Sequence, residues 1–154
     1  MYIAINEVKR PVFNGERVKN FDFIVVSKSG KLILIDVKGK QFPYESKYGK
    51  NYWENWIGID DGKFLRMWSK IFGSNAVGIL VFAYLVSYKE DEKYFKDVFT
   101  FKGNKYGLVA IEINKYLKYS KPRSKCGKGA FNAISVSREK LSNLVKPVSY
   151  FLNN

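Results

Sequence analysis

Residues 21–38 have the sequence FDFIVVSKSGKLILIDVK, in which two runs of β-forming residues flank a Lys-Ser-Gly tripeptide at 28–30. A three-residue loop that ends in glycine is a common connection between antiparallel strands, so this stretch predicts a β-hairpin. Counting outward from that loop places Asp22 opposite Asp36. The fold that we expect is built around this pair of strands.

Side chains alternate between the two faces of a strand, so Asp36 and Lys38 share one face and the odd-numbered apolar residues take the other. Two carboxylates and one ammonium group, from Asp22, Asp36 and Lys38, would then meet at one end of an otherwise apolar hairpin. A two-residue loop at 29–30 would instead oppose Asp22 to Val37 and separate these groups. The inference therefore depends on the length of the loop.

The composition of the 154 residues indicates one globular domain, residues 1–154, since 46% are hydrophobic and 17% aromatic. The net charge of +13 points to a polyanionic partner, of which nucleic acid is the first choice. A basic protein without such a partner is the alternative, because heat-adapted proteins are also rich in lysine. The chain has no histidine and a single cysteine, Cys126, which excludes Ser-His-Asp catalysis, histidine-ligated metals and disulfides within the chain.

A helix is predicted from the Asp60-Asp61 pair, which can cap it, to about Phe72, where Gly73 ends it. Its apolar positions Phe64, Trp68, Ile71 and Phe72 fall on one face. The nearly all-apolar run at 77–86 predicts a strand buried on both faces, so a strand–helix–strand crossover should join it to the hairpin. The other expected elements are strands at 2–5, 52–59 and 131–136, a hairpin of 98–102 with 106–113, and a closing helix from Ser137 that Pro147 interrupts.

Asp22 and Asp36 are candidate ligands for Mg²⁺ (or Mn²⁺), which binds to one or two protein carboxylates and keeps several waters. The backbone carbonyl of Val37 could add a ligand, and Lys38 could position a water and stabilise charge on a phosphate. Such a group hydrolyses phosphodiesters without histidine. The alternative is that Asp36 and Lys38 form an exposed ion pair, which contributes about 0–1 kcal/mol.

Basic and aromatic residues are interleaved at 39–51, expected to be a loop, and at 115–128. Lysine and arginine can contact phosphates while aromatic rings stack on bases, so these stretches suit nucleic acid. Candidate phosphate contacts are Lys40, Arg66, Lys121 and Arg123. A solvated basic surface explains the 115–128 stretch equally well.

Asp22…Asp36-Val37-Lys38 resembles the P-D…(D/E)-x-K motif of the restriction-endonuclease-like nucleases, which include Holliday junction resolvases, with Phe21 in place of the proline. Five further segments, over most of the chain, are similar to the HYExAFE family within this superfamily: Asn6-Glu7 with Arg10-Pro11-Val12-Phe13, Lys19-Asn20-Phe21-Asp22, Asp36-Val37-Lys38-Gly39, Trp53-Glu54-Asn55-Trp56 and Val81-Phe82-Ala83-Tyr84.

The resemblance implies an α/β fold with a restriction-endonuclease-like core, a mixed central sheet flanked by helices in the order αβββαβ. It also implies that Asp22, Asp36 and Lys38 are catalytic and that Mg²⁺ is the cofactor. The first helix of that order, which usually carries a metal-binding glutamate, has no counterpart ahead of the first predicted strand. Either it is absent or another element replaces it, including one from a second subunit. Glu7 and Glu16 are the nearby candidates for its glutamate, and a homodimer is expected by analogy.

The function expected from these observations is Mg²⁺-dependent hydrolysis of DNA phosphodiester bonds, as in DNA repair, recombination or restriction. Two alternatives stay open: a non-catalytic DNA-binding domain of the same fold, and a basic RNA-associated or structural protein. The longest apolar stretch, residues 76–86, is too short to cross a bilayer and the start does not resemble a signal peptide, so we expect a cytoplasmic protein.

Overall fold

The computed structural model describes residues 1–6, 10–123 and 132–154. Its centre is a curled mixed sheet of six strands in the order β1-β4-β5-β9-β11-β10. β5 and β9 run parallel, and every other neighbouring pair in this sheet is antiparallel. The strands are β1 (Tyr2–Ala4), β4 (Phe23–Val26), β5 (Leu32–Phe42), β9 (Ala76–Val86), β10 (Asp97–Phe101) and β11 (Asn104–Glu112).

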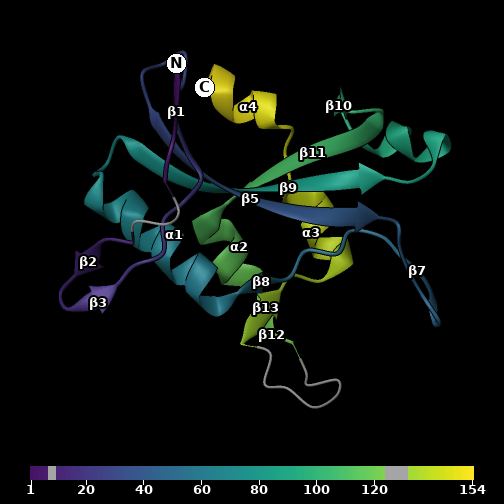
Figure 1. The fold of residues 1–154 in the computed structure, drawn as a ribbon, viewed down its shortest axis with the longest axis horizontal. Helices are drawn as coiled ribbons and strands as arrows, with labels where there is room; N and C mark the ends of the chain where they lie inside the picture. Colours follow the sequence, from purple (N-terminus) through teal and green to yellow (C-terminus); the bar gives the residue numbers. More distant parts are fainter. Residues whose placement is uncertain (7–9, 124–131) are drawn as a thin grey trace.

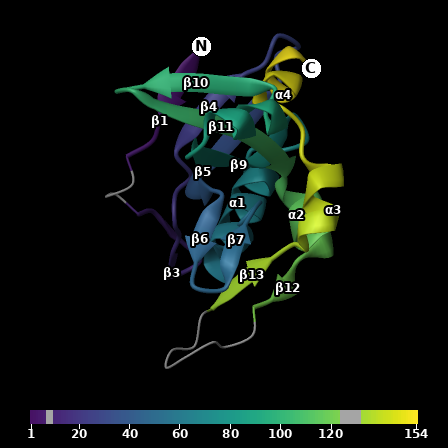
Figure 2. The same cartoon turned by 90° about the vertical axis from the view of Figure 1, so that its right-hand side faces the viewer.

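Helices lie on both faces of this sheet (Figure 1). α1 (Ile59–Ile71), α2 (Ile113–Tyr119) and α3 (Arg138–Leu144) lie on one face, and α4 (Val148–Asn153) lies on the other. The view in Figure 2 shows the smaller sheets away from the central one. Two of them are hairpins, β2 (Val12–Phe13) with β3 (Glu16–Arg17), and β6 (Tyr44–Ser46) with β7 (Gly49–Asn51). The third is a three-stranded sheet of β8 (Ile57–Gly58), β12 (Lys121–Pro122) and β13 (Ala133–Ser135). A 3-10 helix, η1 (Lys89–Tyr94), precedes β10.

The predicted hairpin is confirmed with its three-residue loop. The Ser27 N–H donates to the carbonyl of Lys31 at 2.9 Å, and Gly30 has the positive φ of 83° that suits the last position of such a loop. The strands pair in the expected register as far as Phe23 with Ile35. The even-numbered residues of β5 therefore face α1, and the odd-numbered ones face α4.

The strand–helix–strand crossover is also confirmed, since α1 connects β5 to the parallel strand β9. The buried face of α1 differs from the prediction, however. Gly62, Leu65 and Ser69 are buried, whereas the predicted stripe residues Ile71 and Phe72 are 44% and 37% exposed. α2 also packs against α1, so the buried strip includes small residues that permit close approach.

The strand predicted at 52–59 is wrong for most of its length. Only Ile57–Gly58 form a strand, and it pairs with β13 outside the central sheet. The segment before it is irregular, because Trp53 has a φ of 63° and the Asn55 side chain bonds the backbone of Val136. The stretch 39–51, expected to be a loop, instead continues β5 as far as Phe42 and then forms the β6–β7 hairpin.

Most later elements follow the predictions, although residues 113–119, partly within the basic stretch, form the unpredicted helix α2. β10 and β11 form the expected hairpin, and the C-terminal segment divides into α3 and α4 on either side of Pro147. The strand predicted at 131–136 is observed as β13, with residue 131 outside the described residues. No helix in the described ranges has the length and apolar character needed to cross a bilayer.

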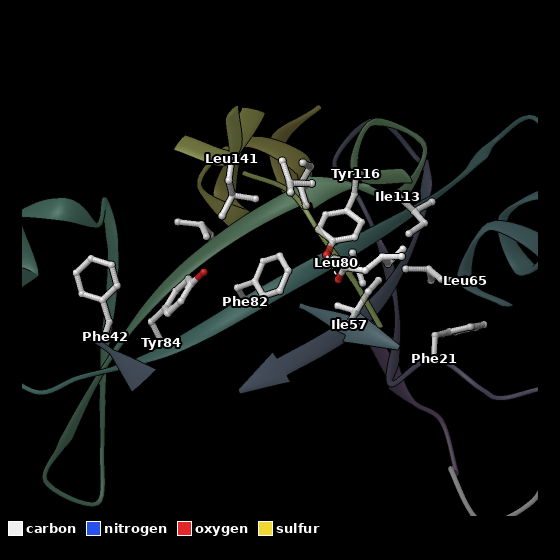
Figure 3. Packing of buried hydrophobic residues seen from close by; sticks show 14 of the residues in the cluster. Phe21, Phe42, Ile57, Leu65, Leu80, Phe82, Tyr84, Ile113, Tyr116 and Leu141 are labelled. Atoms are coloured by element: carbon white, nitrogen blue, oxygen red, sulfur yellow. Dashed lines mark hydrogen bonds between the residues drawn. The ribbon is translucent and has the colours of Figure 1, made fainter. Parts of the chain in front are cut away.

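Two apolar clusters hold the sheet between its helices. The larger lies under α1, α2 and α3 and includes Phe82, Tyr84 and Tyr116, which Figure 3 shows alongside Leu141 of α3. The smaller lies on the opposite face, where Ile33, Ile35, Ile79, Val81 and Ala110 pack with α4. These clusters fix the position of α1 over β5, and that position determines which side chains surround Asp36.

Candidate functional site

The three residues singled out in the sequence lie together where β4 begins and β5 continues beyond it. The Lys38 ammonium is 3.0 Å from Oδ2 of Asp36, and Asp36 is buried, with only 4% of its surface exposed. The Asp22 N–H donates to the Ile35 carbonyl, while Oδ2 of Asp22 accepts from the Val37 N–H at 2.6 Å. Asp22 thus bonds the residues on either side of Asp36, instead of forming the regular ladder pair expected between the two.

A third carboxylate, that of Asp61, joins the group from the first turn of α1. Lys38 bridges the two acids, at 3.0 Å from Oδ2 of Asp61 as well as from Asp36. Lys19, in the segment before β4, also pairs with Asp61. Asp61 additionally accepts a bond from the Gly58 N–H, as helix-capping residues do.

From the sequence, Asp61 is expected only as a helix cap. Its pairing with Lys38 could have been predicted from the strand–helix–strand crossover. A helix that follows a strand in such a connection begins near the carboxyl end of the strands, where Lys38 lies. Nothing local to Lys19 marks it as part of the group.

Burial dominates the electrostatics of Asp36. It raises the pKa of the carboxyl to about 6, with Asp22 and Asp61 adding to the rise and Lys38 opposing it. Burial also pulls the pKa of Lys38 down, but Asp36 and Asp61 outweigh that effect and hold it above its ordinary value. For Asp61, burial favours the neutral acid, yet the bonds from Lys19 and Lys38 keep its pKa below the usual range. Lys38 and Asp61 are therefore charged at neutral pH, and Asp36 is the group nearest to taking up a proton.

The donor set fits a hard divalent cation with few protein ligands. Asp22 and Asp36 repel each other electrostatically, which a cation between them would relieve. The N–H and carbonyl of one strand residue point the same way, so the Val37 carbonyl lies on the edge of β5 where Asp22 bonds the Val37 N–H. Within residues 1–6, 10–123 and 132–154, no three acidic, histidine or cysteine side chains form a group that could hold a metal. Mg²⁺ needs only one or two protein carboxylates, so the pair remains a suitable set; Glu7 lies outside the described residues.

Two of the four predicted phosphate contacts come together beside this group. Lys40 stands over the ring of Trp56, with its ammonium 3.5 Å from the ring centroid. The guanidinium of Arg123 lies 5.9 Å from the same ring and 3.8 Å from Glu54. Burial lowers the pKa of Lys40 to about 8, with Glu54 partly opposing this effect.

The other two predicted contacts lie elsewhere. Arg66 is exposed on α1, where it lines a separate hollow of about 410 Å³ with Lys63 and Lys70. Lys121 is exposed in β12. The remainder of the basic stretch, from residue 124 to 128 and including Cys126, lies outside the described residues. The structure thus brings together Lys40 and Arg123 but not Arg66 or Lys121.

Comparison of the chain with protein-family models, curated proteins and solved structures found no significant match.

Proposed function

We propose that the protein is a Mg²⁺-dependent nuclease that hydrolyses DNA phosphodiester bonds, with Asp22, Asp36 and Lys38 as its catalytic residues. The observation that carries the proposal is the Asp36–Lys38 pair. Asp36 is only 4% exposed, and its carboxylate is 3.0 Å from the Lys38 ammonium. Both lie at the open end of the hairpin, next to the carboxylate of Asp22. Two acids that can hold a metal ion and a lysine that can stabilise negative charge support phosphodiester hydrolysis without histidine.

Asp22, Asp36 and the Val37 carbonyl would hold the cation, which would polarise the phosphate and lower the pKa of a nearby water. Lys38 would donate hydrogen bonds to that water or to a phosphate oxygen, and so stabilise the negative charge that builds up in the transition state. Asp61 would position the Lys38 ammonium from the side of α1. Lys40 and Arg123 would contact neighbouring phosphates, where their charges favour binding of the polyanion.

The chain order of the central elements supports a restriction-endonuclease-like core. β1, β4 and β5 are followed by α1 and then β9, which corresponds to the βββαβ part of the order αβββαβ. Asp22 lies immediately before the second strand of that order, and Asp36 lies on the third. The proposal also includes a cytoplasmic location and a homodimeric state. Size-exclusion chromatography with light scattering would test the homodimeric state.

The test is cleavage of single-stranded, duplex and junction DNA in Mg²⁺ and in EDTA. We expect Mg²⁺-dependent cleavage that Asp36→Asn and Lys38→Met each reduce at least 100-fold, with folding verified by circular dichroism. Asp60→Asn is the matched control, since Asp60 is exposed one position before Asp61 and its loss should leave the rate unchanged. Cleavage that survives in Asp36→Asn, or no cleavage of any of the three substrates, would rule out the proposal.

One observation favours a second candidate, a non-catalytic DNA-binding domain of the same fold. Lys38 bonds both Asp36 and Asp61, so its ammonium is engaged by protein carboxylates. A purely structural ion-pair group would have the same contacts. In that case DNA binding would fall steeply with salt while no metal-dependent cleavage would be seen.

A further inference from the structure

The edge of β5 is open beside the candidate site. β9 pairs with β5 along its whole length to Phe42, but β4 pairs with it only as far as Ile35. In the continuation, the backbone groups of Val37, Gly39 and Gln41 point to the side that β4 has left. Among the described residues, the bond found on this side is that from the Val37 N–H to the Asp22 carboxylate.

A groove of about 560 Å³ runs from Lys40 and Trp56 onto the odd-numbered face of β5 and β9, the face opposite to Lys38. Its apolar floor includes Ala83 and Leu85 of β9, and the rings of Tyr44, Trp56 and Tyr106 line it. Gly39 widens it, because a Cβ at that position would meet no other atom within 4 Å. The size falls within the range of small-molecule sites, and aromatic walls suit a flat ring.

Trp56 is the distinctive residue of this groove. The other two tryptophans, Trp53 and Trp68, pack against the larger apolar cluster. Trp56 is partly buried like them, but its indole N–H donates to Glu54 at 2.9 Å, which fixes the orientation of the ring. Lys40 and Arg123 stand close to the ring, so an aromatic surface and two cations lie side by side.

Lys40 connects the groove to the catalytic group. Lys38 and Lys40 lie on the same face of β5, about 7 Å apart along the strand. A nucleic acid strand whose phosphate lies at Lys38 can therefore contact Lys40 with its next phosphate and extend a base toward Trp56. Glu54 is the acidic group on this path, and Arg123 pairs with it.

We propose that this groove binds an unpaired nucleobase beside the phosphate to be cleaved, so that the substrate class is single-stranded DNA or DNA with unpaired nucleotides. This inference rests on the proposed nuclease function for the role of Lys38. Base stacking on aromatic rings needs an unstacked base, which a regular duplex does not present.

An open strand edge could also pair with a second copy of the chain or with a peptide. Lysines on the edge disfavour such pairing, and Lys38 and Lys40 flank the open groups here. A polyanion with flat, apolar bases satisfies both the cations and the rings of the groove.

The test is binding in EDTA, where no metal-dependent cleavage interferes. Fluorescence anisotropy would measure the affinity of a labelled oligothymidine, of the same oligonucleotide with abasic positions, and of a blunt duplex. We expect Trp56→Ala to weaken oligothymidine binding about 5- to 100-fold and duplex binding less than twofold, since stacking on an aromatic ring contributes per base. Phe101→Ala is the matched control, because Phe101 is 63% exposed on the edge strand β10 and should change neither affinity.

The abasic oligonucleotide tests the groove even where Trp56→Ala fails to fold, because it removes the base from the DNA and leaves the protein unaltered. Weaker binding of this oligonucleotide to the unaltered protein supports the groove. Equal affinity for all three DNAs overturns it, as does a Trp56→Ala variant that folds and binds oligothymidine normally, or a dimer that Trp56→Ala dissociates. Strong Trp56-dependent binding without any Mg²⁺-dependent cleavage would instead overturn the nuclease proposal and leave the base-binding groove in place.

Discussion

Replacing Asp36 by asparagine should make the protein more stable at neutral pH, although Asp36 forms an ion pair. Burial raises the pKa of this carboxyl from its ordinary 3.8 to about 6, after the opposing effect of Lys38. The folded state therefore binds the Asp36 proton more tightly than the unfolded chain does. Each pH unit of difference corresponds to 1.36 kcal/mol, so holding the carboxyl ionised at pH 7.5 costs about 3 kcal/mol.

The pH dependence follows from the same direction. Because the folded pKa is the higher one, the contribution of Asp36 to stability is fully present below about pH 4 and is lost as the pH rises to about 6. Asparagine keeps the shape of the side chain without its charge. We expect Asp36→Asn to raise the free energy of unfolding by about 1–3 kcal/mol at pH 7.5 and to change it little at pH 4.

Urea unfolding followed by circular dichroism, at pH 4 and at pH 7.5 in EDTA, measures this difference. Asp61→Asn is the control of opposite sign. The pKa of Asp61 is held low by Lys19 and Lys38, so its charge stabilises the fold above its ordinary pKa, and that stability is lost as the pH falls. We expect Asp61→Asn to destabilise the protein at pH 7.5. An Asp36→Asn variant that is less stable than the unaltered protein at pH 7.5 would refute the reasoning.

Magnesium extends the experiment to the proposed function. A cation that binds only the folded protein stabilises it as its concentration rises. Adding Mg²⁺ at pH 7.5 should therefore raise the unfolding free energy of the unaltered protein but not that of Asp36→Asn. An identical response of both proteins would argue against Asp36 as a ligand.

Three further predictions concern the fold around the site. Lys38→Met leaves two largely buried carboxylates without their shared cation and should cost about 3–5 kcal/mol in urea unfolding at pH 7.5; a loss below 1 kcal/mol would show that the pair behaves as an exposed one. Phe42→Ala should cost about 3–5 kcal/mol in thermal or urea unfolding, because Phe42 is fully buried, whereas Phe101→Ala should change stability by less than about 0.5 kcal/mol since Phe101 is 63% exposed. Tyr116→Phe removes the donor to the carbonyls of Asn55 and Ile134 and should cost about 1–3 kcal/mol by the same assay, with an unchanged value arguing against these bonds.

The parts of the fold that the sequence predicts are those whose signals are local. The hairpin depends on the alternation of β4 and β5 and on Gly30, and α1 depends on its acidic start and on Gly73, all within a few residues of the elements concerned. The course of residues 39–56 depends instead on contacts with residues that are distant in the sequence. β5 continues to Phe42 because β9 pairs with it and because the Phe42 ring packs on Tyr84 and Phe95, partners at least 40 positions away.

The candidate site likewise contains residues that a local sequence pattern predicts and residues that only long-range packing brings together. The Asp36–Lys38 spacing on one face of a strand is visible in the sequence, since the period of a strand is two. The contribution of Asp61 depends on which face of the sheet α1 covers, and the pairing of Arg123 with Trp56 joins residues 67 positions apart. Composition identifies such residues as basic or aromatic, but only the packed structure shows which of them meet.

One local feature connects the catalytic group to the groove. The chain joins the β4–β5 ladder only after Asp22, and the Asp22 carboxylate accepts the Val37 N–H that an earlier start of β4 would have bonded. The same late start leaves the edge of β5 open from Val37 onward, in front of Lys38 and Lys40. Had β4 begun before Asp22, its backbone would have paired with Gly39 and Gln41 and closed this edge of β5. The start of β4 only after Asp22 thus places an acid beside Asp36 and leaves this edge free for the nucleic acid strand that we propose.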